Sequence, residues 1–127
     1  MNFKTYYLKE SNKPTCKTYA NGDKEWRLNG SLHREDGPAV EYANGKKSWW
    51  LNGKRHREDG PAIEYTNGYK SWYLNGKRHR EDGPAVEHAS GYKAWLLNGK
   101  IYTRETYYKT LYRRKKITKE ELFIHLL

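Results

Sequence analysis

The chain has few of the residues that cross-link small proteins or hold them in a membrane. Cys16 is the only cysteine in 127 residues, which excludes an intrachain disulfide and a cysteine zinc cluster. No apolar run approaches the roughly 18 residues that a membrane span needs. Residues 1–7 also lack the apolar core of a signal peptide. We therefore expect a cytoplasmic protein with no transmembrane segment, and we favour other partners over lipid.

Acidic residues are also scarce, at 15 against 25 Lys and Arg, so the net charge is +10. This sign excludes an acidic mimic of nucleic acid. Phe and Met are rare, whereas the chain has 5 Trp and 12 Tyr. Disordered segments are usually poor in aromatic residues. The composition therefore predicts an ordered protein that packs amphipathic rings.

The main signal is an internal repeat of 23 residues. Its copies begin at Trp26, Trp49, Trp72 and Trp95 and align without gaps. A fixed period of this length is typical of a stacked array. It predicts an N-terminal cap with a partial repeat at 1–25, three full repeats plus the start of a fourth at 26–101, and a basic helical C-terminal cap at 102–127.

Each repeat contains two short turns, for example Asn44-Gly45 and Asn52-Gly53, and the last copy has Ser90-Gly91 at the position of Asn44-Gly45. Asn-Gly between short apolar runs is a strong hairpin signal, because both residues tolerate the positive φ of a type I′ turn. A third turn, Asp36-Gly37-Pro38, marks a wider loop. We therefore predict a mainly β fold, a single-layer antiparallel meander of hairpin repeats with two short strands per repeat and about eight in all, capped by one or two C-terminal α-helices.

A two-residue loop at Asn44-Gly45 would place Val40 opposite Trp49. Because side chains alternate along a strand, Val40, Tyr42, Trp49 and Leu51 would then share one structural face. On the opposite face the copies differ, and aromatic residues alternate with Arg there. Such rows are typical of recognition surfaces, although a one-layer sheet needs amphipathic side chains on both faces in any case. The predicted partner-binding residues are Trp50, Arg55, Tyr69, Tyr73, Arg78 and Tyr92.

The pattern Tyr-x-Asn-Gly-x-Lys-x-Trp-x-Leu-Asn-Gly-Lys resembles the MORN-type repeat, in particular the variant of bacterial antitoxin-like proteins. With its HREDGPA segment it is similar to repeat proteins of bacteriophages and large DNA viruses. The resemblance covers residues 19–101. It implies a twisted array of β-hairpins that serves as a scaffold for protein contact or, in some members, lipid contact. It implies no catalytic residue.

The equivalent residues His33, His56 and His79 each precede Arg-Glu-Asp. Metal binding is one interpretation, but equivalent residues two strands apart would lie roughly 10 Å from each other, too far to share an ion. We favour a structural role in which Arg and the acids pair along the edge. A catalytic site needs a unique constellation, whereas these residues recur three times. We therefore predict no metal, no cofactor and no enzyme activity.

Residues 95–127 carry eight basic and three acidic residues, half of the net charge. The sequence there predicts helix, with a capping box at Thr118 and Glu121. The lid over the last hairpin would use Leu111, Leu122, Phe123 and Leu126. The basic run is a candidate contact for nucleic acid or an acidic partner, and solubility is the remaining explanation. It consists of Arg113, Arg114, Lys115 and Lys116.

Two functions follow from these features. The first is a binding module that acts by protein–protein interaction, a phage or viral protein that inhibits a host defence factor in the host cytoplasm. The alternative is nucleic-acid binding through the basic run, with stacking on the aromatic face. An unpaired sheet edge also leaves a homodimer open.

Overall fold

The computed structural model describes residues 12–127. Residues 1–11 of the predicted N-terminal cap lie outside the described residues. The described chain forms 14 short strands and two helices. The bounds are β1 Thr15–Thr18, β2 Lys24–Leu28, β3 Ser31–Leu32, β4 Val40–Glu41, β5 Lys47–Ser48, β6 Trp50–Leu51, β7 Lys54–Arg55, β8 Ile63–Glu64, β9 Lys70–Ser71, β10 Tyr73–Leu74, β11 Lys77–Arg78, β12 Val86–Glu87, β13 Lys93–Leu97, β14 Lys100–Tyr102, α2 Arg104–Arg113 and α3 Lys119–Leu126.

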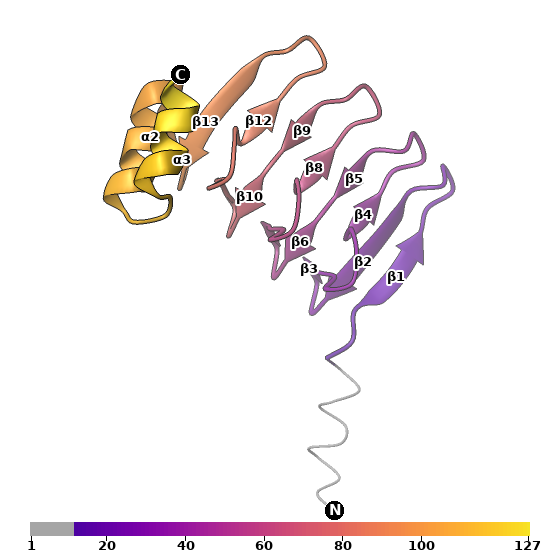
Figure 1. The fold of residues 1–127 in the computed structure, drawn as a ribbon. Coiled ribbons are helices and arrows are strands. Elements are labelled where there is room, and N and C mark those ends of the chain that lie inside the picture. The colour runs from indigo at the N-terminus through magenta and orange to yellow at the C-terminus, as the bar shows by residue number, and fades with distance from the viewer. Residues whose placement is uncertain (1–11) are drawn as a thin grey trace, which may run out of the picture.

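The strands lie side by side in one extended layer, with β1 at one end and the two helices at the other (Figure 1). A ten-stranded antiparallel sheet runs through the array in the order β1-β2-β4-β5-β8-β9-β12-β13-β14, and β3 pairs with β2. The hairpins β6-β7 and β10-β11 lie beside this sheet. The predicted mainly β array of hairpins with helical cap is confirmed.

Each full repeat has more strands than the two that we predicted. The strand that follows the Tyr-x-Asn-Gly turn is interrupted at Trp49 and at Trp72, whereas β2 and β13 run through the equivalent Trp26 and Trp95. The backbone N–H of Trp49 donates to Ala62 of the sheet, whereas its carbonyl accepts from His56. Trp49 therefore bonds to two different segments of the chain, and it lies between β5 and β6.

The Leu-Asn-Gly turns are the two-residue hairpins that the sequence predicts. Leu51 pairs with Lys54, which leaves only Asn52 and Gly53 in the loop. Both residues have a positive φ, 50° and 76°, as a type I′ turn requires.

The Tyr-x-Asn-Gly turns are one residue longer, and the predicted register is wrong. The N–H of Tyr42 donates to the carbonyl of Lys46, and only Gly45 has a positive φ, of 92°. Three residues therefore form the loop, and Val40 faces Ser48 instead of Trp49. A one-residue slip moves a strand's side chains to the other face. The predicted structural face is consequently wrong, because Trp49 lies opposite to Val40 and Tyr42.

The observed register gives the sheet an aromatic face and a loop face. The aromatic face carries Val40, Ser48, Trp50 and their equivalents, and the indole N–H of Trp50 donates to Ser48. The loop face carries Glu41, Trp49 and their equivalents. Val40 and Ser48 are buried although the sheet has one layer. The small Ser48 suits its position because the side chain of Trp50, two residues along, bonds to it.

The C-terminal helices close the last hairpin. Leu97 of β13 and Tyr107, Tyr108 and Leu111 of α2 form a buried cluster. Leu122 of α3 packs on its rim, and the predicted capping box of Thr118 and Glu121 is present.

Two of the four predicted lid residues do not cover the hairpin. Leu111 is buried and Leu122 is partly buried, but Phe123 and Leu126 are exposed. The reason is that α3 packs against α2 and contributes no buried side chain. No helix within residues 12–127 has the length and apolarity to cross a membrane.

Candidate functional site

Five of the six predicted partner-binding residues form one connected row on the aromatic face. The Arg55 guanidinium lies 5.0 Å from the ring centroid of Trp50 and 5.6 Å from that of Tyr73. Arg78 lies 5.7 Å from Tyr73 and donates to the hydroxyl of Tyr69 at 3.4 Å. Contacts within about 6 Å of a ring centroid are in the range of cation–π attraction.

These residues differ in how much surface they leave for a partner. Tyr73 is 8% exposed and belongs to a buried cluster with Ile63, so its ring serves the sheet itself. Trp50 and Arg55 are partly buried, whereas Arg78 and Tyr92 are exposed. The surface available to a partner is therefore concentrated at the third repeat.

A second row of rings crosses the tips of the Tyr-x-Asn-Gly hairpins. Tyr65, Tyr69, His88 and Tyr92 make successive edge-to-face contacts with centroid distances of 5.1, 4.8 and 5.0 Å. Lys46 extends the row, 4.5 Å from the ring of Tyr65. Tyr65 and His88 are not among the predicted binding residues, because the predicted register placed their position on the structural face. A three-residue turn would have predicted this row.

The loop face carries three folded-back loops of identical design, which we name loop 1 (residues 34–38), loop 2 (57–61) and loop 3 (80–84). In loop 2 the guanidinium of Arg57 stacks 3.8 Å from the ring of Trp49 and bonds to Asp59 at 3.0 Å. It also donates to the carbonyl of Pro61 at 3.1 Å and to Glu64 at 3.2 Å. Arg34 and Arg80 make the equivalent contacts. The predicted pairing of Arg with the loop acids is confirmed.

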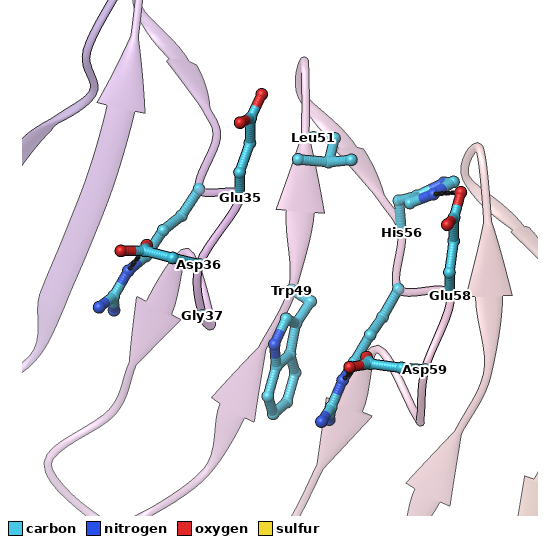
Figure 2. A pocket seen from close by; sticks show the side chains of 10 residues that line it. Glu35, Asp36, Gly37, Trp49, Leu51, His56, Glu58 and Asp59 are labelled. Atoms are coloured by element: carbon cyan, nitrogen blue, oxygen red, sulfur yellow. Dashed lines mark hydrogen bonds and ion pairs between the residues drawn. The ribbon is translucent and has the colours of Figure 1, made fainter.

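Successive loops leave an open groove between them. The 1–2 groove, about 620 Å³, has Trp49 and Leu51 between loop 1 and loop 2 (Figure 2). The 2–3 groove, about 690 Å³, has Trp72 and Leu74 at the equivalent positions. The side chains of Glu35 and Glu58 are 84% exposed at the rims. Each groove therefore combines an apolar floor with exposed glutamates at its rims, and the loop arginines also line it.

The three equivalent histidines join consecutive repeats. Nδ1 of His33 accepts from the backbone N–H of Asn52 at 3.0 Å, and His56 and Asn75 repeat this bond at 3.0 Å. Nε2 of His56 faces Glu58 at 3.5 Å. An Nδ1 that accepts from a backbone amide is occupied, which fits a structural role. Among residues 12–127 no three His, Cys, Asp or Glu side chains gather as a metal site would require.

The basic run lies where α2 ends. Lys116 pairs with Glu81 at 3.5 Å, so one of its charges is met by an acid within the chain. Arg113 donates to Thr110 at 3.1 Å. Arg113 and Arg114 line a shallow groove of about 480 Å³ together with Lys100 of β14. The structure thus brings part of the run together with the last Asn-Gly-Lys turn.

No protein-family model matches the chain, and no curated protein matches it. A hairpin array does not by itself identify the MORN-type family. The resemblance therefore stays a prediction, and the function has to be argued from the surfaces.

Proposed function

We propose that this chain is a non-enzymatic repeat module that binds a protein partner through its aromatic face. The observation that carries the proposal is the continuous row of Tyr65, Tyr69, His88 and Tyr92, with Arg78 beside it. Tyr and Arg are enriched at the energetic centres of protein interfaces. Rings that are already fixed by stacking lose little conformational freedom when a partner binds.

The repeats also support a binding role over a catalytic one. Each polar cluster recurs in successive copies with the same contacts, as with Arg34, Arg57 and Arg80. A repeated arrangement offers an extended partner several similar contacts. The finer proposal, that the partner is a host factor inhibited by a phage or viral protein, rests on the resemblance over residues 19–101.

The test compares the wild type with the double variant Arg78→Ala, Tyr92→Ala. Both side chains are exposed, so the fold should be retained. We expect affinity purification from a bacterial lysate to recover a stoichiometric protein, and the purified pair to bind at least tenfold more weakly with the variant. Tyr19→Ala, at the other end of the array, is the matched control. Equal recovery by wild type and double variant would contradict the proposal.

Nucleic-acid binding is the second candidate, supported by the groove that Lys100, Tyr102, Arg113 and Arg114 line. An aromatic ring beside cations suits a single strand. The triple variant Arg113→Ser, Arg114→Ser, Lys115→Ser removes charge and keeps the contact between Lys116 and Glu81. We expect binding to labelled single-stranded DNA that weakens steeply with salt and is lost in this variant. Binding that persists in the variant would end this candidate.

A further inference from the structure

Loop 3 is occupied by a side chain from α2. The ring of Tyr107 is fully buried, and its hydroxyl donates to the carbonyl of Arg80. The same oxygen lies 3.0 Å from the carbonyl oxygen of Gly83 and accepts from the Gly83 N–H at 3.3 Å. The loop therefore forms a backbone niche for a phenol hydroxyl.

A lysine accompanies this tyrosine. Nζ of Lys116 lies 3.5 Å from Glu81 at the rim of the same loop. The side chain of Glu81 is 40% exposed, compared with 84% for Glu35 and Glu58. The chain itself thus shows which pair of groups loop 3 accepts, a tyrosine on its backbone and a lysine on its glutamate.

Loops 1 and 2 contain the same residues in the same internal bonding, but their niches are open. Within residues 12–127, no hydrogen bond reaches the carbonyl of Arg34 or Arg57, or the N–H of Gly37 or Gly60. Gly37 and Gly60 line the 1–2 and 2–3 grooves. The two niches therefore face open space at the positions that Tyr107 fills in loop 3.

We propose that the 1–2 and 2–3 grooves bind an extended basic segment of a partner protein that carries tyrosines. One tyrosine hydroxyl binds the Arg34 carbonyl and the Gly37 amide of loop 1, and a second binds the equivalent groups of loop 2. Lysine or arginine residues of the segment pair with Glu35 and Glu58. This site lies on the loop face and is separate from the aromatic face.

The spacing of the loops specifies the conformation of this segment. Equivalent loops are two strands apart, about 9.6 Å at a strand spacing of about 4.8 Å. A polyproline II segment advances about 3.1 Å per residue with three residues per turn, so every third side chain points the same way about 9.3 Å further on. A Tyr-x-x-Tyr segment therefore matches two successive niches.

A helix does not fit these grooves. With its side chains a helix is about 10–12 Å wide, as wide as the whole spacing between loops. The helix α2 reaches loop 3 because the array ends there and no fourth loop lies opposite. The partner segment is accordingly extended, although the tyrosine that it imitates comes from a helix.

The experiment uses the full chain, labelled with ¹⁵N, and the peptide acetyl-Lys-Tyr-Pro-Lys-Tyr-Pro-Lys-amide. We expect saturable shifts of the Gly37 and Gly60 amides with the Gly91 amide, on the aromatic face side of the array, unchanged. A peptide with Phe in both Tyr positions should bind about tenfold more weakly, because it lacks both hydroxyls. A peptide with one extra Pro between the tyrosines should also bind more weakly, since it breaks the spacing.

Protein variants complete the test. Glu58→Gln should weaken binding about 2–5-fold, and Glu120→Gln on α3 is the matched control. Equal binding of the Tyr and Phe peptides would overturn the proposal, as would the absence of shifts at millimolar peptide. The double variant Arg78→Ala, Tyr92→Ala should bind the peptide normally, so the two proposed surfaces succeed or fail separately.

Discussion

Leu74 and Leu97 occupy the same position in successive copies of the repeat, yet their surroundings differ. Leu74 lies between two loops and is partly buried, whereas Leu97 lies under α2 and is 2% exposed. The tryptophans before them differ in the same way. Arg80 stacks on Trp72, while Trp95 packs against the helical cap. Inside the array a charged loop covers the sheet, and at its end the buried side of α2 does so.

The difference lies in what covers the Trp and Leu side chains on the loop face of each repeat. A repeat presents a Trp-Leu strip on its loop face, and the arginine of its own loop covers only part of that strip. The remainder stays open as a groove. At the end of the array the same strip becomes the core of the C-terminal cap. On the loop face, apolar burial is therefore greatest at the cap, and open surface remains in the interior.

Alanine substitution at the two leucines gives the largest expected effect. Leu97→Ala leaves a cavity under α2 and should lower the free energy of unfolding by about 2–5 kcal/mol. Leu74→Ala removes a partly exposed side chain and should cost well under half of that. Urea unfolding followed by tryptophan fluorescence measures both values. Equal losses would mean that the cap and the interior do not differ in packing.

Tyr107→Phe tests the cap through a single hydroxyl. The variant leaves the Arg80 carbonyl and the buried Gly83 amide without their partner, so the free energy of unfolding should fall by about 1–3 kcal/mol. Tyr112→Phe on the exposed side of α2 is the matched control and should change nothing. If the two variants unfold alike, the hydroxyl does not hold α2 to loop 3.

Arg57→Lys tests the interior in the same way. Lysine retains the charge but loses the planar group that stacks on Trp49 and bonds to Asp59 and Pro61. We expect a loss of about 1–2 kcal/mol, compared with less than about 0.5 kcal/mol for Arg27→Lys, whose side chain pairs at the surface. A neutral Arg57→Lys would show that the loops need only positive charge.

Alkaline titration gives the smallest effect. Burial raises the pKa of Tyr107 above its ordinary value of 10.0, so the folded state holds this proton more tightly than the unfolded state. Its contribution to stability is present below pH 10 and declines as the pH rises further. The stability of the wild type should therefore fall more between pH 9 and pH 11 than that of Tyr107→Phe. Parallel curves would contradict this assignment.

Much of the fold was predictable because its signals are local. Asn52-Gly53 fixes a two-residue turn within four residues, and Thr118 with Glu121 fixes a helix start within one turn. The turn at Asn44-Gly45 was not predictable in detail, because the same dipeptide serves two-residue and three-residue loops. The one extra residue in this loop determines which face of the sheet carries Trp49.

The candidate sites were predictable to different degrees. The row of Trp50, Arg55 and Tyr73 was found from differences between the copies. Tyr65 and His88 were not predicted, because the predicted register of the Tyr-x-Asn-Gly hairpins was wrong. The niche in loop 3 depends on a contact between Tyr107 and Gly83, 24 residues apart, and no local pattern indicates it. A long-range contact of this kind can be recognised only when the fold is known.

The contact of the cap with a single loop has a consequence for evolution and engineering. Tyr107 and Lys116 reach only loop 3 among the three loops by hydrogen bond or ion pair. If a duplicated 23-residue copy were inserted before β12, α2 would therefore still pack against an equivalent last loop, one repeat further along the array. Such a chain would be about 10 Å longer and would gain one groove. The number of repeats can thus change by duplication or loss of whole 23-residue copies, while both ends of the array stay the same.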